Sequence, residues 1–142
     1  MGFIGQHKLR EQLFMLLFRV EFCERDEMPE QVKLFFEDEE RADSEEYSEV
    51  ITQKYEKIMQ KLPELDALLN EKTEKWNTKR IGKVELTVLR LALYEMLYDE
   101  EIPEGVAIDE AVTIAKKFGQ ESSGAFVNGV LAKFVKKGDQ NS

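Results

Sequence analysis

Residues 102–137, IPEGVAIDEAVTIAKKFGQESSGAFVNGVLAKFVKK, contain two stretches of helical apolar spacing separated by a polar turn. In the first stretch, the apolar residues at positions 108, 111, 112 and 115 recur at the spacing of one helix face. Gly119 is predicted to end this helix in the left-handed conformation that glycine tolerates, and Ser122 or Ser123 to cap the next helix. No alternating β-branched run elsewhere in the chain predicts a strand, so the fold is predicted to be all-α.

The hexapeptide FVNGVL at residues 126–131 places an amide and a glycine inside the last of these helices. Asparagine competes with the helix backbone for hydrogen bonds, and glycine costs about 1 kcal/mol relative to alanine in a helix interior. Both residues therefore need a packing or binding reason. We favour packing, in which Asn128 bonds to a neighbouring backbone segment and Gly129 lets that segment approach.

The remaining helices are predicted from the same spacing and from the positions of the prolines. Five helical stretches precede the two just described, at about residues 8–24, 29–36, 43–62, 63–76 and 82–99. Pro63 is predicted to restart the chain between two helices, because proline lacks the N–H that a helix interior needs. Seven helices with short connections predict an all-α bundle in a single domain spanning residues 1–142.

Two of these helices carry residues with more than one interpretation. In the first, Phe14, Phe18 and Phe22 form a second apolar stripe, which predicts either a helix sandwiched inside the fold or a face for a partner. We favour the sandwiched interpretation for Phe14 and Phe22 and leave Phe18 open. In the helix at 82–99, Arg90 and Glu95 are expected to form ion pairs, because unpaired buried charges are costly. Glu85 could equally face outward toward a partner.

The sequence offers little for catalysis. It contains no phosphate-binding glycine loop, metalloprotease motif or calcium-loop spacing. The single Cys23 and single His7 cannot form a disulfide or a zinc site by themselves. If both lay on one helix they would be about 24 Å apart, too far for a nucleophile and its base. We therefore expect no enzyme, metal or cofactor, with a small enzyme using an unrecognised carboxylate site as the least favoured alternative.

The net charge of −9 and the acidic run at 37–49 argue against strong nonspecific nucleic-acid binding. A local site is still possible. His7, Lys8 and Arg10 open the first helix, and the turn at 119–123 opens the last, where unpaired N–H groups favour phosphate oxygens. Together these two helix starts would form a small anion-binding corner. Phe126 could stack on a base, with a core phenylalanine as the equal alternative.

Several strings in the chain occur in the same order in one known family. They are LFMLLFRVEF at 13–22, VELTVLRLALYE at 84–95, VAIDEAV at 106–112, AKKFG at 115–119 and FVNGVL at 126–131. Over its whole length the chain resembles the NusB family of bacterial transcription antitermination factors. The resemblance implies two three-helix subdomains, 1–62 and 63–142, around a shared core.

The resemblance also implies a function. NusB proteins bind the boxA element of single-stranded ribosomal-operon RNA together with NusE, a small-subunit ribosomal protein, in RNA polymerase antitermination complexes. They have no enzymatic activity and use no cofactor. With no signal peptide and no membrane-length apolar run in the sequence, we expect a cytoplasmic protein without a membrane partner, a monomer or homodimer when free.

Carried over residue by residue, the resemblance implies two sets of binding residues. The expected RNA-binding residues are His7, Lys8, Arg10, Ser122 and Phe126, and the expected partner-binding residues are Phe18, Phe22 and Glu85.

The chain also departs from the family pattern. Many relatives have arginines where this chain has Gln6, His7 and Lys8, a basic residue at the position of Ala125, and an aspartate at that of Ala132. Fewer cations predict weak RNA affinity without the partner. Two alternatives remain: a NusB-like domain related to that of ribosomal RNA methyltransferases, and an all-α protein–protein adaptor with no RNA role.

Overall fold

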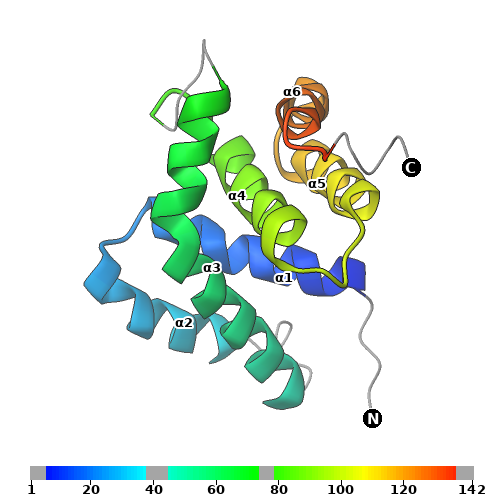
Figure 1. Cartoon of the computed structure of the whole chain (residues 1–142). Helices are drawn as coiled ribbons and strands as arrows, with labels where there is room; N and C mark the ends of the chain where they lie inside the picture. Colours follow the sequence, from blue (N-terminus) through cyan, green and yellow to red (C-terminus); the bar gives the residue numbers. More distant parts are fainter. Residues whose placement is uncertain (1–5, 38–44, 74–78, 137–142) are drawn as a thin grey trace. The chain divides into compact units, whose positions relative to one another are not determined.

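The computed structural model describes residues 6–37, 45–73 and 79–136, and the regular structure in these ranges is entirely helical (Figure 1). The all-α prediction is confirmed. The described ranges hold six α-helices rather than seven: α1 (Gln6–Phe18), α2 (Met28–Glu37), α3 (Glu45–Lys72), α4 (Lys83–Tyr98), α5 (Glu104–Phe118) and α6 (Glu121–Ala132). Two short 3-10 helices, η1 (Arg19–Glu21) and η2 (Arg25–Glu27), lie between α1 and α2.

The predicted break at Pro63 is wrong, because α3 runs through this proline for 28 residues. A proline inside a helix removes one hydrogen bond and costs roughly 3 kcal/mol. On both sides of it, however, Leu62, Leu65 and Leu69 are buried. Burying one leucine side chain contributes roughly 1.5–3 kcal/mol, so three of them offset the cost of the proline.

The first helix is shorter than predicted. It ends at Phe18, and the backbone tightens into η1 before Phe22, so Cys23 lies outside α1. Phe14 is buried as expected, but Phe22 is 62% exposed and the sandwiched interpretation is wrong for it. The predicted single helix over 8–24 ignored this change of helical pitch, which turns Phe22 away from the core.

The chain packs as two compact units, Met1–Gln60 and Lys61–Ser142, with the boundary inside α3. In the first unit, the Tyr47 hydroxyl lies 3.5 Å from the Lys8 carbonyl oxygen and joins the start of α3 to the start of α1. The Arg19 guanidinium donates to the backbone and side-chain oxygens of Gln31 in α2 and lies over the Phe35 ring. The proposed subdomain boundary after residue 62 stays a prediction.

In the second unit, α4, α5 and α6 pack against one another. The predicted ion pair of Arg90 is confirmed: its Nε and Nη2 atoms each lie 2.8 Å from a carboxylate oxygen of Asp66. Glu95 is buried within α4. Lys133, directly after α6, donates to the carbonyl oxygen of Lys72 at the end of α3, where a cation complements the helix dipole.

None of the helices within the described ranges combines the length and the apolar character that a membrane crossing requires. The predicted start of a helix at residue 43 and the predicted end of a helix at residue 76 fall outside the described residues.

Candidate nucleic-acid and partner interface

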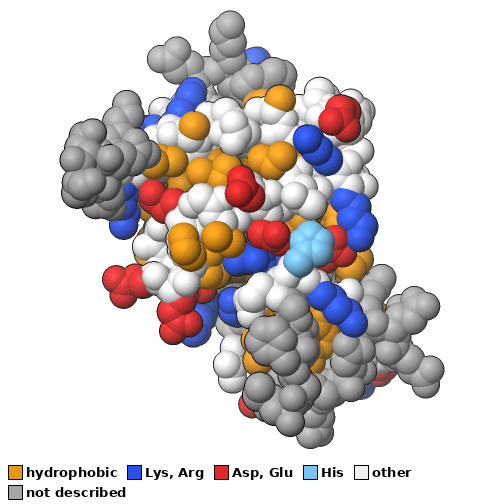
Figure 2. All heavy atoms as spheres, turned by 90° about the vertical axis from the view of Figure 1, so that its right-hand side faces the viewer, with side chains coloured by type: hydrophobic (Ala, Val, Ile, Leu, Met, Phe, Trp, Pro, Cys, Tyr) orange, Lys and Arg blue, Asp and Glu red, His pale blue; other side chains and the backbone are white. Residues whose placement is uncertain are grey.

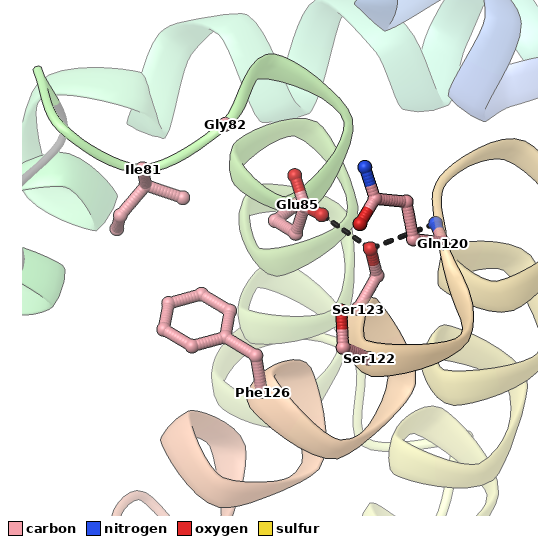
Figure 3. Close-up of a pocket in the computed structure, with 7 residues that line it drawn as sticks. All are labelled: Ile81, Gly82, Glu85, Gln120, Ser122, Ser123 and Phe126. Carbon is pink, nitrogen blue, oxygen red and sulfur yellow. Dashed lines mark hydrogen bonds between the residues drawn. The ribbon is translucent and has the colours of Figure 1, made fainter.

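A pocket of ≈ 360 Å³ opens in the second unit where α6 begins (Figure 3). Ile81 and Gly82 precede α4, Glu85 lies in the first turn of α4, and the rest of the lining comes from the turn before α6 and from α6 itself. Those remaining residues are Gln120, Ser122, Ser123 and Phe126. Two of the predicted RNA-binding residues, Ser122 and Phe126, thus share one pocket with Glu85, a predicted partner-binding residue.

The start of α6 is capped by its own side chains. Gln120 is the N-cap residue, and its side chain accepts a hydrogen bond from the backbone N–H of Ser123. In return the Ser123 hydroxyl accepts from the Gln120 backbone N–H at 3.0 Å. The predicted cap at Ser122 or Ser123 is therefore wrong in position. Ser123 is the third residue of the helix and closes a reciprocal capping box with a glutamine in the role that serine or threonine commonly takes.

Glu85 adds a negative charge to this helix start. The Ser123 hydroxyl donates a hydrogen bond to Glu85 Oε2, so the carboxylate lies beside the first turn of α6 (Figure 3). A carboxylate there complements the positive end of the helix dipole. The N–H groups of Gln120 and Ser123 are already bonded, which leaves fewer donors for a phosphate than the sequence predicted.

Gly119 leaves space for the hydrogen bonds of Ser123 because it has no side chain. Its φ of −110° is not left-handed, so the predicted helix-ending conformation is wrong. A Cβ at this position would lie 2.7 Å from Ser123 Oγ and 2.8 Å from the Ala115 carbonyl oxygen. Only glycine leaves the Ser123 hydroxyl room to reach Glu85 and the Gln120 N–H. The sequence signal for this need is the G-Q-x-x-S order at 119–123.

Phe126 and Ser122 are the two predicted RNA-binding residues that line the pocket. Phe126 is half-buried and Ser122 exposed, and Figure 3 shows the Phe126 ring and the Ile81 side chain on the same side of the pocket. Ile81 is itself buried. Sequence reasoning missed Ile81 because it lies outside any helical stripe, in the turn before α4.

The amide and glycine of the FVNGVL string do not pack as predicted. Asn128 and Gly129 are both exposed, and a Cβ built on Gly129 would meet no atom within 4 Å. The predicted close approach of a backbone segment at Gly129 is therefore wrong among the described residues. The close approach in α6 is at Gly124 instead, where a Cβ would lie 2.7 Å from Lys116 Cε and 3.2 Å from Val112 Cγ1 of α5.

The N-terminal basic residues belong to the first unit. His7 and Lys8 are exposed on the first turn of α1, whereas Arg10 is 4% exposed. His7 Nε2 lies 2.9 Å from a carboxylate oxygen of Glu11, one turn along the helix. That these residues and the α6 start form one anion-binding corner stays a prediction, because the two groups lie in different units.

The aromatic stripe of α1 runs from the core to the surface. The rings of Phe14 and Phe18 stack with centroids 5.7 Å apart, and those of Phe18 and Phe22 meet edge to face at 5.0 Å. Phe14 is 2% exposed and Phe22 is 62% exposed. The half-buried Phe18 thus connects an exposed ring to the core of the first unit.

Side chains of both charges occur on the face drawn in Figure 2. On the face drawn in Figure 2, the Lys and Arg side chains of described residues alternate with Asp and Glu side chains. Within the described ranges, no three His, Cys, Asp or Glu side chains are grouped so that they could hold a metal ion. Binding at this surface would therefore depend on local contacts and not on a broad field.

Comparison with known proteins places the chain in a family. The model of the NusB family matches residues 7–136. The transcription antitermination protein NusB of Agathobacter rectalis is 48% identical over 128 residues, which cover 90% of this chain and 97% of the relative.

Solved structures of NusB proteins show the same similarity. The structure of T. maritima NusB superposes with a TM-score of 0.78 and 36% identity, covering 93% of this chain and 91% of that chain. A chain in the crystal structure of the antitermination factors NusB and NusE in complex with dsRNA gives a TM-score of 0.77 at 26% identity, covering 90% of this chain and 93% of that chain. Because sequence, fold and family model agree over nearly the whole length, the chain belongs to the NusB family.

Proposed function

We propose that this protein is a non-enzymatic, cytoplasmic antitermination adaptor that binds boxA-type single-stranded RNA of ribosomal operons together with NusE. It helps hold RNA polymerase in a terminator-resistant complex. The A. rectalis relative is a transcription antitermination protein, and a structural neighbour was crystallised with NusE and dsRNA. Both support this function.

The observation that carries the proposal is the position of Phe126. Its ring lines an open pocket beside the exposed Ser122 hydroxyl, so a base can stack on the ring while the hydroxyl bonds to a phosphate or base edge. Only an unpaired base can reach a ring in this way, which favours single-stranded RNA. Stacking of this kind contributes about 1–3 kcal/mol per base.

Lys8 and His7 are proposed as the phosphate contacts of the first unit. Both side chains are exposed, and the link between Lys8 and Tyr47 uses the Lys8 backbone carbonyl, so the ammonium group is not involved in it. Arg10 is also proposed as an RNA-binding residue, because the family resemblance implies it. Its side chain is 4% exposed, so a phosphate can reach it only if the side chain turns outward.

Phe18 and Phe22 are proposed as the NusE-binding face. A large exposed aromatic side chain supported by a second ring is typical of the anchor residues of protein interfaces. Glu85 is proposed to take part from the second unit. Because its carboxylate accepts a hydrogen bond from Ser123, a contact with NusE would compete with or extend that bond.

A gel shift with a boxA-like RNA, with and without NusE, tests the RNA part of this function. Phe126→Ala and Lys8→Glu should each weaken RNA binding by the pair about tenfold, the effect of losing one stacked base or one phosphate contact. The matched control is Lys57→Glu, an exposed lysine on α3, which should leave binding unchanged if the charge effect is local. A double-stranded version of the RNA should bind more weakly.

Binding to NusE is tested by a separate affinity measurement. Phe22→Ser should reduce the affinity for NusE without RNA by about fivefold or more, because truncation of an anchor residue commonly costs over 1 kcal/mol. If the protein binds NusE tightly but ignores the RNA in every combination, the adaptor without an RNA role replaces the proposed function.

A further inference from the structure

Glu85 offers an unused hydrogen-bond acceptor to the pocket at the start of α6. Its Oε2 atom accepts from the Ser123 hydroxyl, whereas no described residue donates to its Oε1 atom. The side chain is half-buried, and Oε1 is not among the buried unbonded atoms of the described residues, so a ligand in the pocket can reach it. An ionised carboxylate accepts hydrogen bonds and donates none. A ligand group that binds here therefore has to supply N–H or O–H donors.

Gly82 leaves the space in which this oxygen atom lies. A Cβ built on Gly82 would overlap Glu85 Oε1 and would lie 3.3 Å from the carboxylate carbon. The φ of −58° and ψ of 151° at Gly82 belong to a region that all L-residues can adopt. Glycine is thus needed here for space beside the carboxylate and not for its conformational freedom.

Gln120 adds a donor to the same pocket. Its side-chain oxygen accepts from the Ser123 N–H in the capping box, which assigns the other end of the amide as the NH2 group. No described residue accepts a hydrogen bond from that NH2 group. Gln120 and Glu85 are both bonded to Ser123, so the donor and the acceptor lie on one side of the pocket. The Phe126 ring lies on the other side (Figure 3).

The carboxylate favours a base over a phosphate as the occupant of this pocket. Phosphate oxygens are negatively charged acceptors, so Glu85 repels them. An unpaired base has a π-face for the Phe126 ring and a free edge for hydrogen bonds. The pocket volume of ≈ 360 Å³ lies within the range of roughly 300–1,000 Å³ that small-molecule pockets have. A single base of an RNA chain therefore matches the ring, the charge and the size of the pocket.

Guanine is the base whose pairing edge matches these polar groups. Its N1–H and N2 amino donors are neighbours, and its O6 acceptor lies beside them. The two donors can bond to the Glu85 carboxylate while O6 accepts from the Gln120 NH2 group. Adenine and cytosine have a ring-nitrogen acceptor beside their amino group, and uracil has a carbonyl oxygen on each side of its N–H. Each of these three bases would place an acceptor against the carboxylate.

We propose that Glu85 and Gln120 select a guanine base of the bound RNA, which stacks on Phe126 and directs its pairing edge toward the two side chains. The N1–H and N2 amino groups donate to the Glu85 carboxylate, and O6 accepts from the Gln120 NH2 group. Gly82 is a positioning residue, because it leaves room for the carboxylate. This inference rests on the proposed RNA-binding function and adds to it one base that the protein reads.

The probe is a boxA-like single-stranded RNA that contains guanosine, and its control is the same RNA with inosine in place of every guanosine. Inosine lacks only the N2 amino group. Both affinities are measured by gel shift at a saturating concentration of NusE. The inosine RNA should bind about tenfold more weakly, because the lost bond is to a charged acceptor. An RNA with 7-deazaguanosine, which keeps the pairing edge and alters the opposite edge, should bind as the guanosine RNA does.

Two variants test the placement of the carboxylate, with the ratio of the guanosine and inosine affinities as the readout. Glu85→Gln keeps the size of the side chain and should bring this ratio close to one. Gly82→Ala keeps the charge but displaces the carboxylate, so it should also lose most of the preference. The matched controls are Glu100→Gln, exposed and outside the pocket, and Gly105→Ala, where a Cβ meets no atom within 4 Å. Both controls should keep the preference, and thermal unfolding verifies that each variant is folded.

Equal affinities of the guanosine and inosine RNAs would overturn the proposal, as would a guanosine preference that Glu85→Gln leaves intact. Because Glu85 is also proposed as a NusE contact, the affinity of each variant for NusE is measured without RNA. Weaker NusE binding with an intact guanosine preference would make Glu85 a protein contact and not a base contact. RNA that binds without a guanosine preference overturns this inference alone, whereas absence of binding by every RNA overturns the proposed RNA-binding function with it.

Discussion

The Ser123 hydroxyl donates a hydrogen bond to the Glu85 carboxylate and so ties the first turn of α6 to the first turn of α4. The same hydroxyl accepts from the Gln120 N–H, and Gly119 leaves the space in which it does so. One serine thus caps a helix, holds a charged residue of another helix and lines the pocket at which RNA binding is proposed.

Removal of this hydroxyl should destabilise the fold measurably. Ser123→Ala is expected to lower the free energy of unfolding by about 1–2 kcal/mol, because it removes a helix cap and the donor to a carboxylate. Denaturant unfolding followed by circular dichroism measures the change. Ser122→Ala is the matched control, since Ser122 is exposed and should change the stability by less than about 0.5 kcal/mol. Equal effects of the two substitutions would contradict the role given to Ser123.

Two glycines of the C-terminal region should respond oppositely to alanine. At Gly119 a Cβ would lie 2.8 Å from the Ala115 carbonyl oxygen, so Gly119→Ala should destabilise the protein by about 2 kcal/mol. At Gly129 the space is open and the backbone is helical, so Gly129→Ala should stabilise it by about 0.5–1 kcal/mol. Thermal unfolding of both variants in one buffer provides the test. A loss of stability in Gly129→Ala would reveal a packing role at this position after all.

The pair of Arg90 and Asp66 should show a strong coupling in a double-mutant cycle. Their side chains are only 11% and 26% exposed, and two parallel hydrogen bonds join them. We expect a coupling energy of about 1–2 kcal/mol between Arg90→Gln and Asp66→Asn, larger than the value of an exposed pair. The pair Lys116 and Glu121, at 3.7 Å and well exposed, serves as the reference and should give a coupling near zero. Additive effects at Arg90 and Asp66 would mean that the two side chains do not stabilise each other.

Stability should fall in alkaline solution through Tyr98. The hydrogen bond that its hydroxyl donates to Glu64, 2.8 Å away, raises the pKa of Tyr98 above 10.0 in the folded state. The folded protein therefore keeps this proton to higher pH than the unfolded chain. The contribution to stability is complete below pH 10.0 and is lost as the pH rises through the folded-state pKa. Tyrosinate absorbance measures the titration, and Glu64→Gln should move the pKa of Tyr98 back toward its ordinary value. An unchanged titration in Glu64→Gln would rule out the hydrogen bond as the cause.

Much of the fold followed from local patterns. The apolar stripes predicted the bounds of α4 to within a few residues and placed a helix where α5 lies, because helix periodicity acts over a few neighbouring positions. The ion pair of Arg90 was expected because a charge inside an apolar helix is costly to bury without a partner. The family resemblance rested on strings spread along the chain, and the match over residues 7–136 agrees with it.

The predictions that the structure contradicts failed for one physical reason. The sequence by itself determined that the chain would be helical and where its apolar faces lie, since those properties depend on spacing along a single helix. Only the tertiary structure decided that α3 continues through Pro63 and that Glu85 meets Ser123. Glu85 and Ser123 are 38 positions apart, and no local pattern specifies which distant side chains meet. Burial of leucines on both sides of a proline and the space left by a missing Cβ are properties of packed neighbours, and they exist only once the chain has folded.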